Sequence, residues 1–225
     1  MTPEEKIIVQ IEKLLSLFSA EIKIAEESFS KDDLRLKFYY APGNTLVSLF
    51  FHMSAIDSTI CKPLWWQSRF NKNGPSELDA GAIKNFESYT KFSFLVFFFS
   101  QVETNFRKII NIVSPQFDPK RDKSFYSIYT EFFDKTGQKK FNDLFHIMRL
   151  IRNTLHTNGV YISNEGKDVK YIWKGELYKF SHLKVVDFLT WDKFLYLVEE
   201  IFYVLKEIMS NPSIKSPSYI KDDFN

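Results

Sequence analysis

Apolar residues recur every three or four positions over several long stretches of the chain, which is the spacing of one face of an α-helix. The pattern predicts a first helix to about Ser28, beginning at Thr2-Pro3-Glu4-Glu5, where a capping hydroxyl precedes proline and acids. Further helices are predicted over about 45–61, 76–113, 124–133, 139–157 and 190–210. We interpret Pro42-Gly43 as a turn, 63–75 as a loop, and the residues from Asn211 as a loose tail.

The apolar period shortens to two between the last two long helices, which indicates strands. Val160–Ile162, Val169–Trp173 and Glu176–Phe180 fit short strands, and Lys174-Gly175 fits the turn of a hairpin. The sequence therefore predicts an all-α protein, a helical bundle of about five to seven helices, with a small β-hairpin between the last two long helices. We expect a single domain over 1–225.

Composition supports a folded helical protein. The chain is 44% hydrophobic and 26% charged, and it has 24 Phe against 7 Gly and 8 Pro, so a large core with few breaks is expected. The net charge of +2 excludes a uniformly basic nucleic-acid coat, although a local basic patch remains compatible with it.

Compartment is inferred from three features. The single cysteine, Cys61, permits no internal disulfide and is interpreted as inert core. The acidic N-terminal segment lacks the order of a signal peptide, and the apolar run at 94–99 is far shorter than a membrane span. We expect a soluble, cytoplasmic protein with no membrane partner.

The segment FHIMRLIRNTLHTNGVY, 145–161, carries the most informative chemistry. At about 100° per residue, Arg149, Arg152 and His156 fall on one stripe of the predicted helix, beside an apolar stripe that docks the helix in the core. A titratable imidazole beside permanent positive charge suits a phosphodiester substrate. Arg and His also offset the negative end of a helix dipole, so a purely structural role is the alternative.

The segment RLIRNTLHTNG resembles the signature of the HEPN superfamily, small helical-bundle domains with an Arg, usually a following polar residue, and a His four to six positions beyond. The resemblance covers about 76–210 and leaves 1–75 as an N-terminal helical extension. Arg152 is followed by Asn153 but lies only three intervening residues from His156, whereas Arg149 has six intervening residues but precedes a leucine. Which arginine has the family role stays open.

The earlier segment SQVETNFRKI is similar to the family's helix with a buried polar position. Glu103 and Asn105 there are expected to support the motif helix, with the carboxylate orienting Arg149 or His156. The alternative is a surface ion pair of Glu103 with Arg107, four residues on.

The resemblance implies a metal-independent endoribonuclease, a toxin or defence effector that acts on RNA as a homodimer and meets an antitoxin or regulatory protein. The implied catalytic residues are His156 as general base or acid, Arg149 and Arg152 as phosphate ligands, and Asn153 as a positioning group. No metal and no cofactor are expected.

RNA contacts are expected from the hairpin. Nine basic residues against four acidic ones lie between Lys139 and Lys184, and Lys170, Tyr171 and Trp173 are predicted to bind single-stranded RNA by phosphate contacts and base stacking. Ordinary aromatic packing is the alternative.

Two other functions stay open. The same fold can act as a non-catalytic HEPN-like module that binds a protein partner or nucleic acid, or as a purely structural bundle. The sequence has no Gly-rich phosphate loop, paired CxxC, HExxH or GxSxG motif, and His52 is interpreted as a core histidine.

Overall fold

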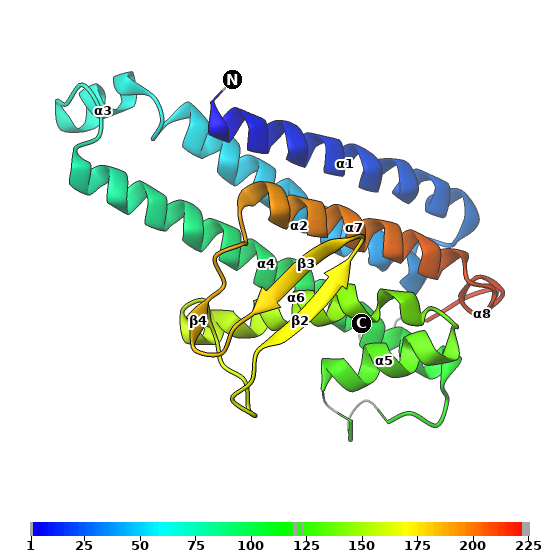
Figure 1. Cartoon of the computed structure of the whole chain (residues 1–225). Coiled ribbons are helices and arrows are strands. Elements are labelled where there is room, and N and C mark those ends of the chain that lie inside the picture. Colours follow the sequence, from blue (N-terminus) through cyan, green and yellow to red (C-terminus); the bar gives the residue numbers. More distant parts are fainter. Residues whose placement is uncertain (1, 119–120, 123, 222–225) are drawn as a thin grey trace.

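A computed structural model describes residues 2–118, 121–122 and 124–221, and this part of the chain forms eight α-helices and two small antiparallel sheets (Figure 1). The mainly helical architecture with a small hairpin confirms the fold class predicted from the apolar pattern. The helices are α1 Pro3–Ser28, α2 Leu34–Ser58, α3 Pro63–Phe70, α4 Glu77–Val113, α5 Phe125–Lys135, α6 Asn142–Thr154, α7 Trp191–Ser210 and α8 Pro212–Lys215. The strands are β1 Val160–Tyr161, β2 Val169–Trp173, β3 Glu176–Phe180 and β4 Lys184–Val185.

The long helices share one hydrophobic core. Helix α1 packs against α2 and α7, α2 also packs against α4, and α6 contacts α4, α5 and β2 (Figure 1). Apart from Trp66 of α3, the buried hydrophobic residues from Ile7 to Ile220 belong to a single apolar cluster. The first two helices therefore help to build the core that supports the motif helix α6.

Helix beginnings follow the local sequence signals. Thr2 with Glu5 and Ser76 with Asp79 form reciprocal capping boxes at the starts of α1 and α4, and Thr190 caps α7. These caps satisfy amide groups that the first turn of a helix leaves without partners, which is why the predicted starts of these helices agree with the structure.

The turn expected at Pro42-Gly43 is wrong, because both residues lie buried inside α2. An added Cβ on Gly43 would lie 3.7 Å from the Cβ of Phe18 on α1, which is an ordinary van der Waals contact, so the packing of the two helices does not require a glycine here. Helix α2 packs against α1, α4 and α7. Burial against these helices offsets the backbone hydrogen bond that a proline removes, and packing overrides the local turn preference.

The loop expected at 63–75 is also wrong in its first half, which is α3. Pro63 occupies the first turn, where proline needs no amide partner, and Asn71 ends the helix in the left-handed region at φ 54°. The rings of Trp65, Trp66 and Phe70 pack on one another, with the two indoles 5.1 Å apart. This local aromatic cluster gives a helix of 8 residues its apolar contacts.

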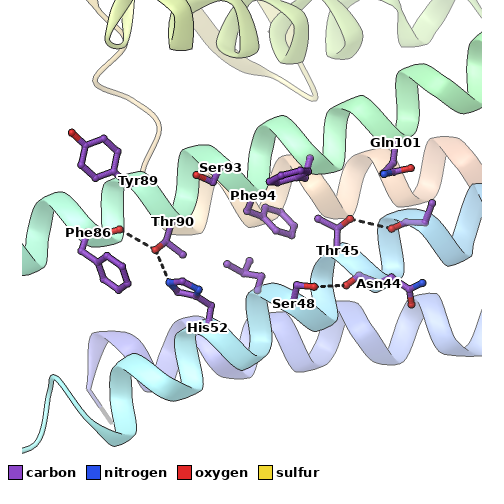
Figure 2. Close-up of a pocket in the computed structure, with 13 residues that line it drawn as sticks. Asn44, Thr45, Ser48, His52, Phe86, Tyr89, Thr90, Ser93, Phe94 and Gln101 are labelled. Carbon is purple, nitrogen blue, oxygen red and sulfur yellow. Dashed lines mark hydrogen bonds between the residues drawn. The ribbon is translucent and has the colours of Figure 1, made fainter. Parts of the chain in front are cut away.

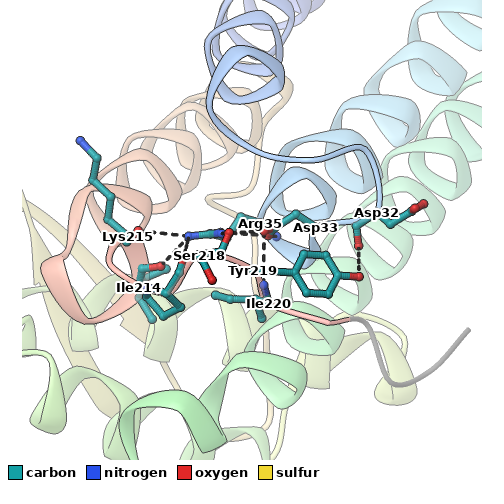
Figure 3. A network of polar contacts seen from close by, with 9 residues as sticks. Asp32, Asp33, Arg35, Ile214, Lys215, Ser218, Tyr219 and Ile220 are labelled. Atoms are coloured by element: carbon teal, nitrogen blue, oxygen red, sulfur yellow. Dashed lines mark hydrogen bonds and ion pairs between the residues drawn. The ribbon is translucent and has the colours of Figure 1, made fainter.

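The tail after Asn211 is packed rather than loose, up to residue 221. Arg35, at the start of α2, is 1% exposed and forms an ion pair of 2.6 Å with the buried Asp33. The guanidinium also donates to the carbonyl oxygens of Ile214, at 3.2 Å, and Pro217, at 2.9 Å (Figure 3). The Asp33 carboxylate accepts from the amide of Ile220. A buried ion pair with these extra hydrogen bonds fixes the tail against the helical bundle.

The helix predicted over 139–157 ends earlier in the structure and finishes in a tighter turn. Helix α6 ends at Thr154, a 3₁₀ turn follows over Leu155–Thr157, and Gly159 at φ +82° reverses the chain into β1. Strand β1 pairs with β4, which the sequence did not predict, and β2 pairs with β3 in the expected hairpin. The two sheets hold the segment after α6 against the helical bundle.

None of the helices in residues 2–118, 121–122 and 124–221 combines the length and apolar character needed to cross a bilayer.

Candidate functional site

A groove of about 400 Å³ lies beside the last turns of α6. Its walls come from α6, from the connection between β1 and β2, and from β2 itself. Arg149 and Asn153 line it on the helix side, and Lys167, Asp168 and Tyr171 line it on the opposite side. The groove is more polar than apolar, and of the predicted motif residues Arg149 and Asn153 line it.

Arg149 is the motif residue best placed for an anionic ligand. Its guanidinium carbon lies 5.3 Å from the ring centroid of Tyr126 on α5, and its Nε atom is buried without a hydrogen-bond partner. Among the described residues, no carboxylate forms an ion pair with Arg149. The guanidinium also interacts with the Tyr129 hydroxyl. An arginine without a carboxylate partner at the wall of a groove can bind a phosphate or a carboxylate through its terminal nitrogens.

Arg152 points to a different neighbour. One of its terminal nitrogens lies 3.2 Å from Glu103 on α4, and the same carboxylate pairs with Arg107 at 2.6 Å. The carboxylate of Glu103 therefore meets the motif helix, as the sequence suggested, but at Arg152 rather than at Arg149 or His156. The Glu103–Arg107 pair expected as an alternative is present as well.

Asn105 faces away from the motif helix. Its side chain is buried and donates to the backbone carbonyl of Lys37 on α2, at 3.2 Å. Two residues along a helix are separated by about 200°, so Glu103 and Asn105 lie on opposite faces of α4. The expectation that both residues support the motif is corrected: Glu103 contacts it and Asn105 ties α4 to α2.

His156 is exposed and lies in the 3₁₀ turn after α6, outside the lining of the groove. The structure therefore brings Arg149 and Asn153 together in one groove but directs Arg152 to α4 and His156 to solvent. A helical wheel assumes one continuous α-helix, and the tightening after Thr154 breaks that assumption.

Successive residues of strand β2 lie on alternate faces, so the residues predicted to bind RNA lie in different environments. Tyr171 is half-buried and lines the groove, whereas Lys170 is exposed on the other face of β2. Trp173 is 9% exposed, and its indole nitrogen donates to Glu200 on α7 at 2.9 Å. Trp173 is therefore part of the core and is unavailable for base stacking, which corrects the expectation for this residue. Tyr161 and Tyr178 are buried too.

His146 is a candidate that the sequence analysis missed. Its Nδ1 shares a hydrogen bond with the hydroxyl of Tyr129, and its ring stacks on Tyr126 with centroids 5.3 Å apart. Burial lowers the pKa of His146, and the Arg149 charge lowers it further, so the imidazole is neutral near pH 7. The signal available in the sequence was spacing, because His146 and Arg149 are three apart and share a helix face.

Charges at the groove are largely compensated. Lys167 pairs with Glu165 at 3.2 Å, and Asp168 lies 3.5 Å from the amine of Lys179. The basic surplus between Lys139 and Lys184 therefore does not collect at this groove. Among the described lining residues, Arg149 is the cation that has no carboxylate partner.

No group of three or more His, Cys, Asp or Glu side chains gathers into a metal-binding arrangement within the described parts of the chain. Comparisons of the chain with protein-family models, curated proteins and solved structures found no match. The function is therefore inferred from the site itself.

Proposed function

We propose that this chain is a HEPN-like, metal-independent endoribonuclease, a toxin or defence effector in which Arg149 binds the scissile phosphate of RNA. The observation that carries the proposal is Arg149 itself, which lines a polar groove and has no carboxylate partner among the described residues. Asn153, one turn later, lines the same wall and is proposed to bind the ribose or a phosphate oxygen through its side-chain amide. Of the two motif arginines, the geometry favours Arg149 for the family role.

RNA supplies its own nucleophile, the 2′-hydroxyl. Cleavage requires removal of its proton, stabilisation of charge on the pentavalent phosphorus, and protonation of the leaving 5′-oxygen. An arginine stays protonated at working pH and stabilises the charge, while a histidine side chain can transfer protons. The products are a 2′,3′-cyclic phosphate and a 5′-hydroxyl, and His156 is the proposed proton-transfer group.

One chain does not place His156 at its own groove. Arg149 and His156 are seven residues apart, which is roughly 10 Å along a helix axis, and helical side chains lean toward the N-terminus. The proposed active unit is therefore a homodimer, in which the exposed His156 of one copy reaches the Arg149 groove of the other.

Glu103 and Arg152 act as positioning residues in this proposal. The carboxylate of Glu103 binds Arg152 and Arg107 at once, so Arg152 holds α6 against α4 and leaves the phosphate to Arg149. Lys170 is exposed and Tyr171 lines the groove, so these two remain proposed RNA contacts on opposite faces of the hairpin.

A second function is favoured by two observations. His156 lies outside the groove, and the carboxylates of Glu165 and Asp168 line it, where they repel a phosphodiester. Both features suit a non-catalytic HEPN-like module that binds RNA or a protein partner without cleaving RNA. Cleavage and binding must therefore be measured separately.

The test is cleavage of single-stranded RNA in excess EDTA by the wild-type protein and by the Arg149→Ala and His156→Ala variants. We expect wild-type cleavage despite chelation, a loss of at least about 100-fold in each variant, and little change in Arg69→Ala, which removes an exposed arginine from α3. Absence of wild-type cleavage with RNA binding that depends on Arg149 supports the binding module. Equal activity in all variants contradicts both proposals.

A further inference from the structure

A second cavity, of about 650 Å³, lies between α2 and the middle of α4 (Figure 2). It shares no lining residue with the Arg149 groove. Its volume falls within the range of about 300–1,000 Å³ typical of small-molecule sites.

The two walls of this cavity differ in chemistry. Helix α4 contributes aromatic rings, including Phe86, Phe94 and Phe97, and Phe97 is 63% exposed (Figure 2). Helix α2 contributes small polar residues, including Asn44 and Ser48. Aromatic faces that remain open to water gain stability when a flat apolar molecule covers them.

The lining contains no acidic residue, no lysine and no arginine among its 13 residues. A charged ligand that enters such a site loses hydration without gaining an ion pair, which is costly. The chemistry of the lining therefore selects an uncharged ligand.

Several polar side chains of the cavity already have partners. The hydroxyl of Ser48 donates to the carbonyl of Asn44 at 3.1 Å, and the hydroxyl of Thr90 donates to the carbonyl of Phe86 at 2.9 Å (Figure 2). Because the Thr90 proton is used, the His52 Nε2 at 3.1 Å from the Thr90 oxygen must be the donor in that contact. His52 is exposed, which corrects its interpretation as a core residue.

The side-chain amides of Asn44 and Gln101 add hydrogen-bonding capacity to that of the Tyr89 and Ser93 hydroxyls. Each amide offers both a donor and an acceptor, and both residues line the cavity (Figure 2). A ligand matched to them carries a donor and an acceptor on its edge.

We propose that the cavity between α2 and α4 binds a planar, uncharged heteroaromatic molecule, stacked on the rings of α4 and hydrogen-bonded at its edge by Asn44 and Gln101. This site is separate from the proposed ribonuclease groove, and its test requires no nuclease activity.

Quinolin-2-one serves as the probe, because it is a flat, neutral bicycle with an amide edge. Its binding to the full chain is measured by ligand-detected NMR and calorimetry, beside quinoline-2-carboxylate, which adds a charge, and decan-1-ol, which is aliphatic. We expect saturable quinolin-2-one binding at micromolar to millimolar concentration and at least about tenfold weaker binding of both comparison compounds.

Two serines provide matched variants. Ser48 and Ser16 are both exposed, and each donates to the carbonyl four residues before it on its helix, but only Ser48 lines the cavity. Ser48→Trp fills the cavity and should abolish quinolin-2-one binding, whereas Ser16→Trp should leave it unchanged. Gln101→Leu keeps the apolar walls and removes one amide, so about tenfold weaker binding is expected from it even where Ser48→Trp fails to fold.

Three results overturn the proposal. The first is absence of saturable quinolin-2-one binding to the wild-type chain. The second is equal binding by the wild type and Gln101→Leu, or by the wild type and a folded Ser48→Trp. The third is equal or tighter binding of decan-1-ol or the carboxylate, which would assign the cavity to an amphiphile or an anion.

Discussion

At the scale of single residues, the proposed ribonuclease groove depends on an arginine that lies beside a neutral imidazole. Arg149 and His146 both contact the ring of Tyr126, and the positive charge of Arg149 disfavours protonation of His146. The two side chains therefore form one electrostatic unit, in which a change at one must alter the titration of the other.

Arg149→Met should raise the pKa of His146 toward its ordinary value, because it removes a nearby positive charge while burial persists. The measurement is an NMR titration of the imidazole resonances. Arg152→Met is the matched control, since Arg152 is compensated by Glu103, and the pKa of His146 should not change in it. An unchanged titration in Arg149→Met, or the same shift in both variants, contradicts this coupling.

The buried pair of Asp33 and Arg35 provides a prediction about stability. Arg35→Met leaves the Asp33 carboxylate buried without its cation, and it should lower the free energy of unfolding by about 3–5 kcal/mol in urea titrations. Arg121→Met, which breaks an exposed pair with Asp122, should cost less than about 1 kcal/mol. A cost for Arg35→Met as small as that control would show that the tail is held by other contacts.

The same pair predicts the direction of a pH effect. Burial alone raises the pKa of the Asp33 carboxyl, but hydrogen bonds from Arg35 and Ile220, and the Arg35 charge, outweigh burial and hold it below its ordinary value. The carboxylate therefore contributes stability above the pKa it has in the unfolded chain, and that contribution is lost as pH falls through the folded pKa. Asp33→Asn should be less stable than the wild type near pH 7, with a smaller loss of stability on acidification below about pH 4. Parallel pH profiles for the two proteins would contradict this assignment.

At the scale of elements, Gly43 and Gly175 should respond to alanine substitution in opposite directions, because one lies in a helix and the other in a turn. Gly43 lies inside α2, where an added Cβ meets Phe18 at 3.7 Å, an ordinary contact, so Gly43→Ala should stabilise the protein by about 1 kcal/mol. Gly175 lies in the hairpin turn at φ +83°, so Gly175→Ala should destabilise it by about 1 kcal/mol. Thermal unfolding of both variants measures the change in stability. A change in the same direction for both would contradict the role assigned to one glycine.

The elements also show which features the sequence could predict. Helix starts depend on neighbours along the chain, as at Thr2 and Ser76, so their positions could be read directly. The path of α2 through Pro42 depends on α1 and α4, which no local pattern contains. Whether Trp173 stacks on a ligand or packs in the core is decided by Glu200, 27 residues further on.

The candidate site divides in the same way. Its position beside the last turns of α6 could be predicted from spacing, whereas the contact of Glu103 with that helix was expected only from the resemblance of SQVETNFRKI to a family pattern. The direction of each side chain could not be predicted from the sequence, because Arg149 contacts Tyr126 of α5 and Arg152 contacts Glu103 of α4. His146 was overlooked because Tyr126 and Tyr129, which give it a special environment, come from a different helix.

At the scale of the whole molecule, the proposed homodimer predicts complementation. If Arg149 of one copy acts with His156 of the other, mixed dimers of Arg149→Ala and His156→Ala chains contain one intact pair. After re-pairing of the two inactive variants, cleavage should return to roughly a quarter of the wild-type rate, because about half the dimers are mixed and each has one of two sites. No recovery from variants that both elute as dimers, or a monomeric wild type, contradicts an active site shared between copies.

The buried contacts of Arg35 with Asp33 and with the tail also constrain how a newly made chain can fold. The carbonyl of Ile214 is synthesised 179 residues after the guanidinium that it accepts from, and the ribosome adds residues far more slowly than helices form. During that interval α1 and α2 can pair, but Arg35 has to remain hydrated or find temporary acceptors. Completion of the bundle therefore waits until residues 214–220 have been synthesised, and a nascent chain stalled before this segment would leave Arg35 and Asp33 open to water.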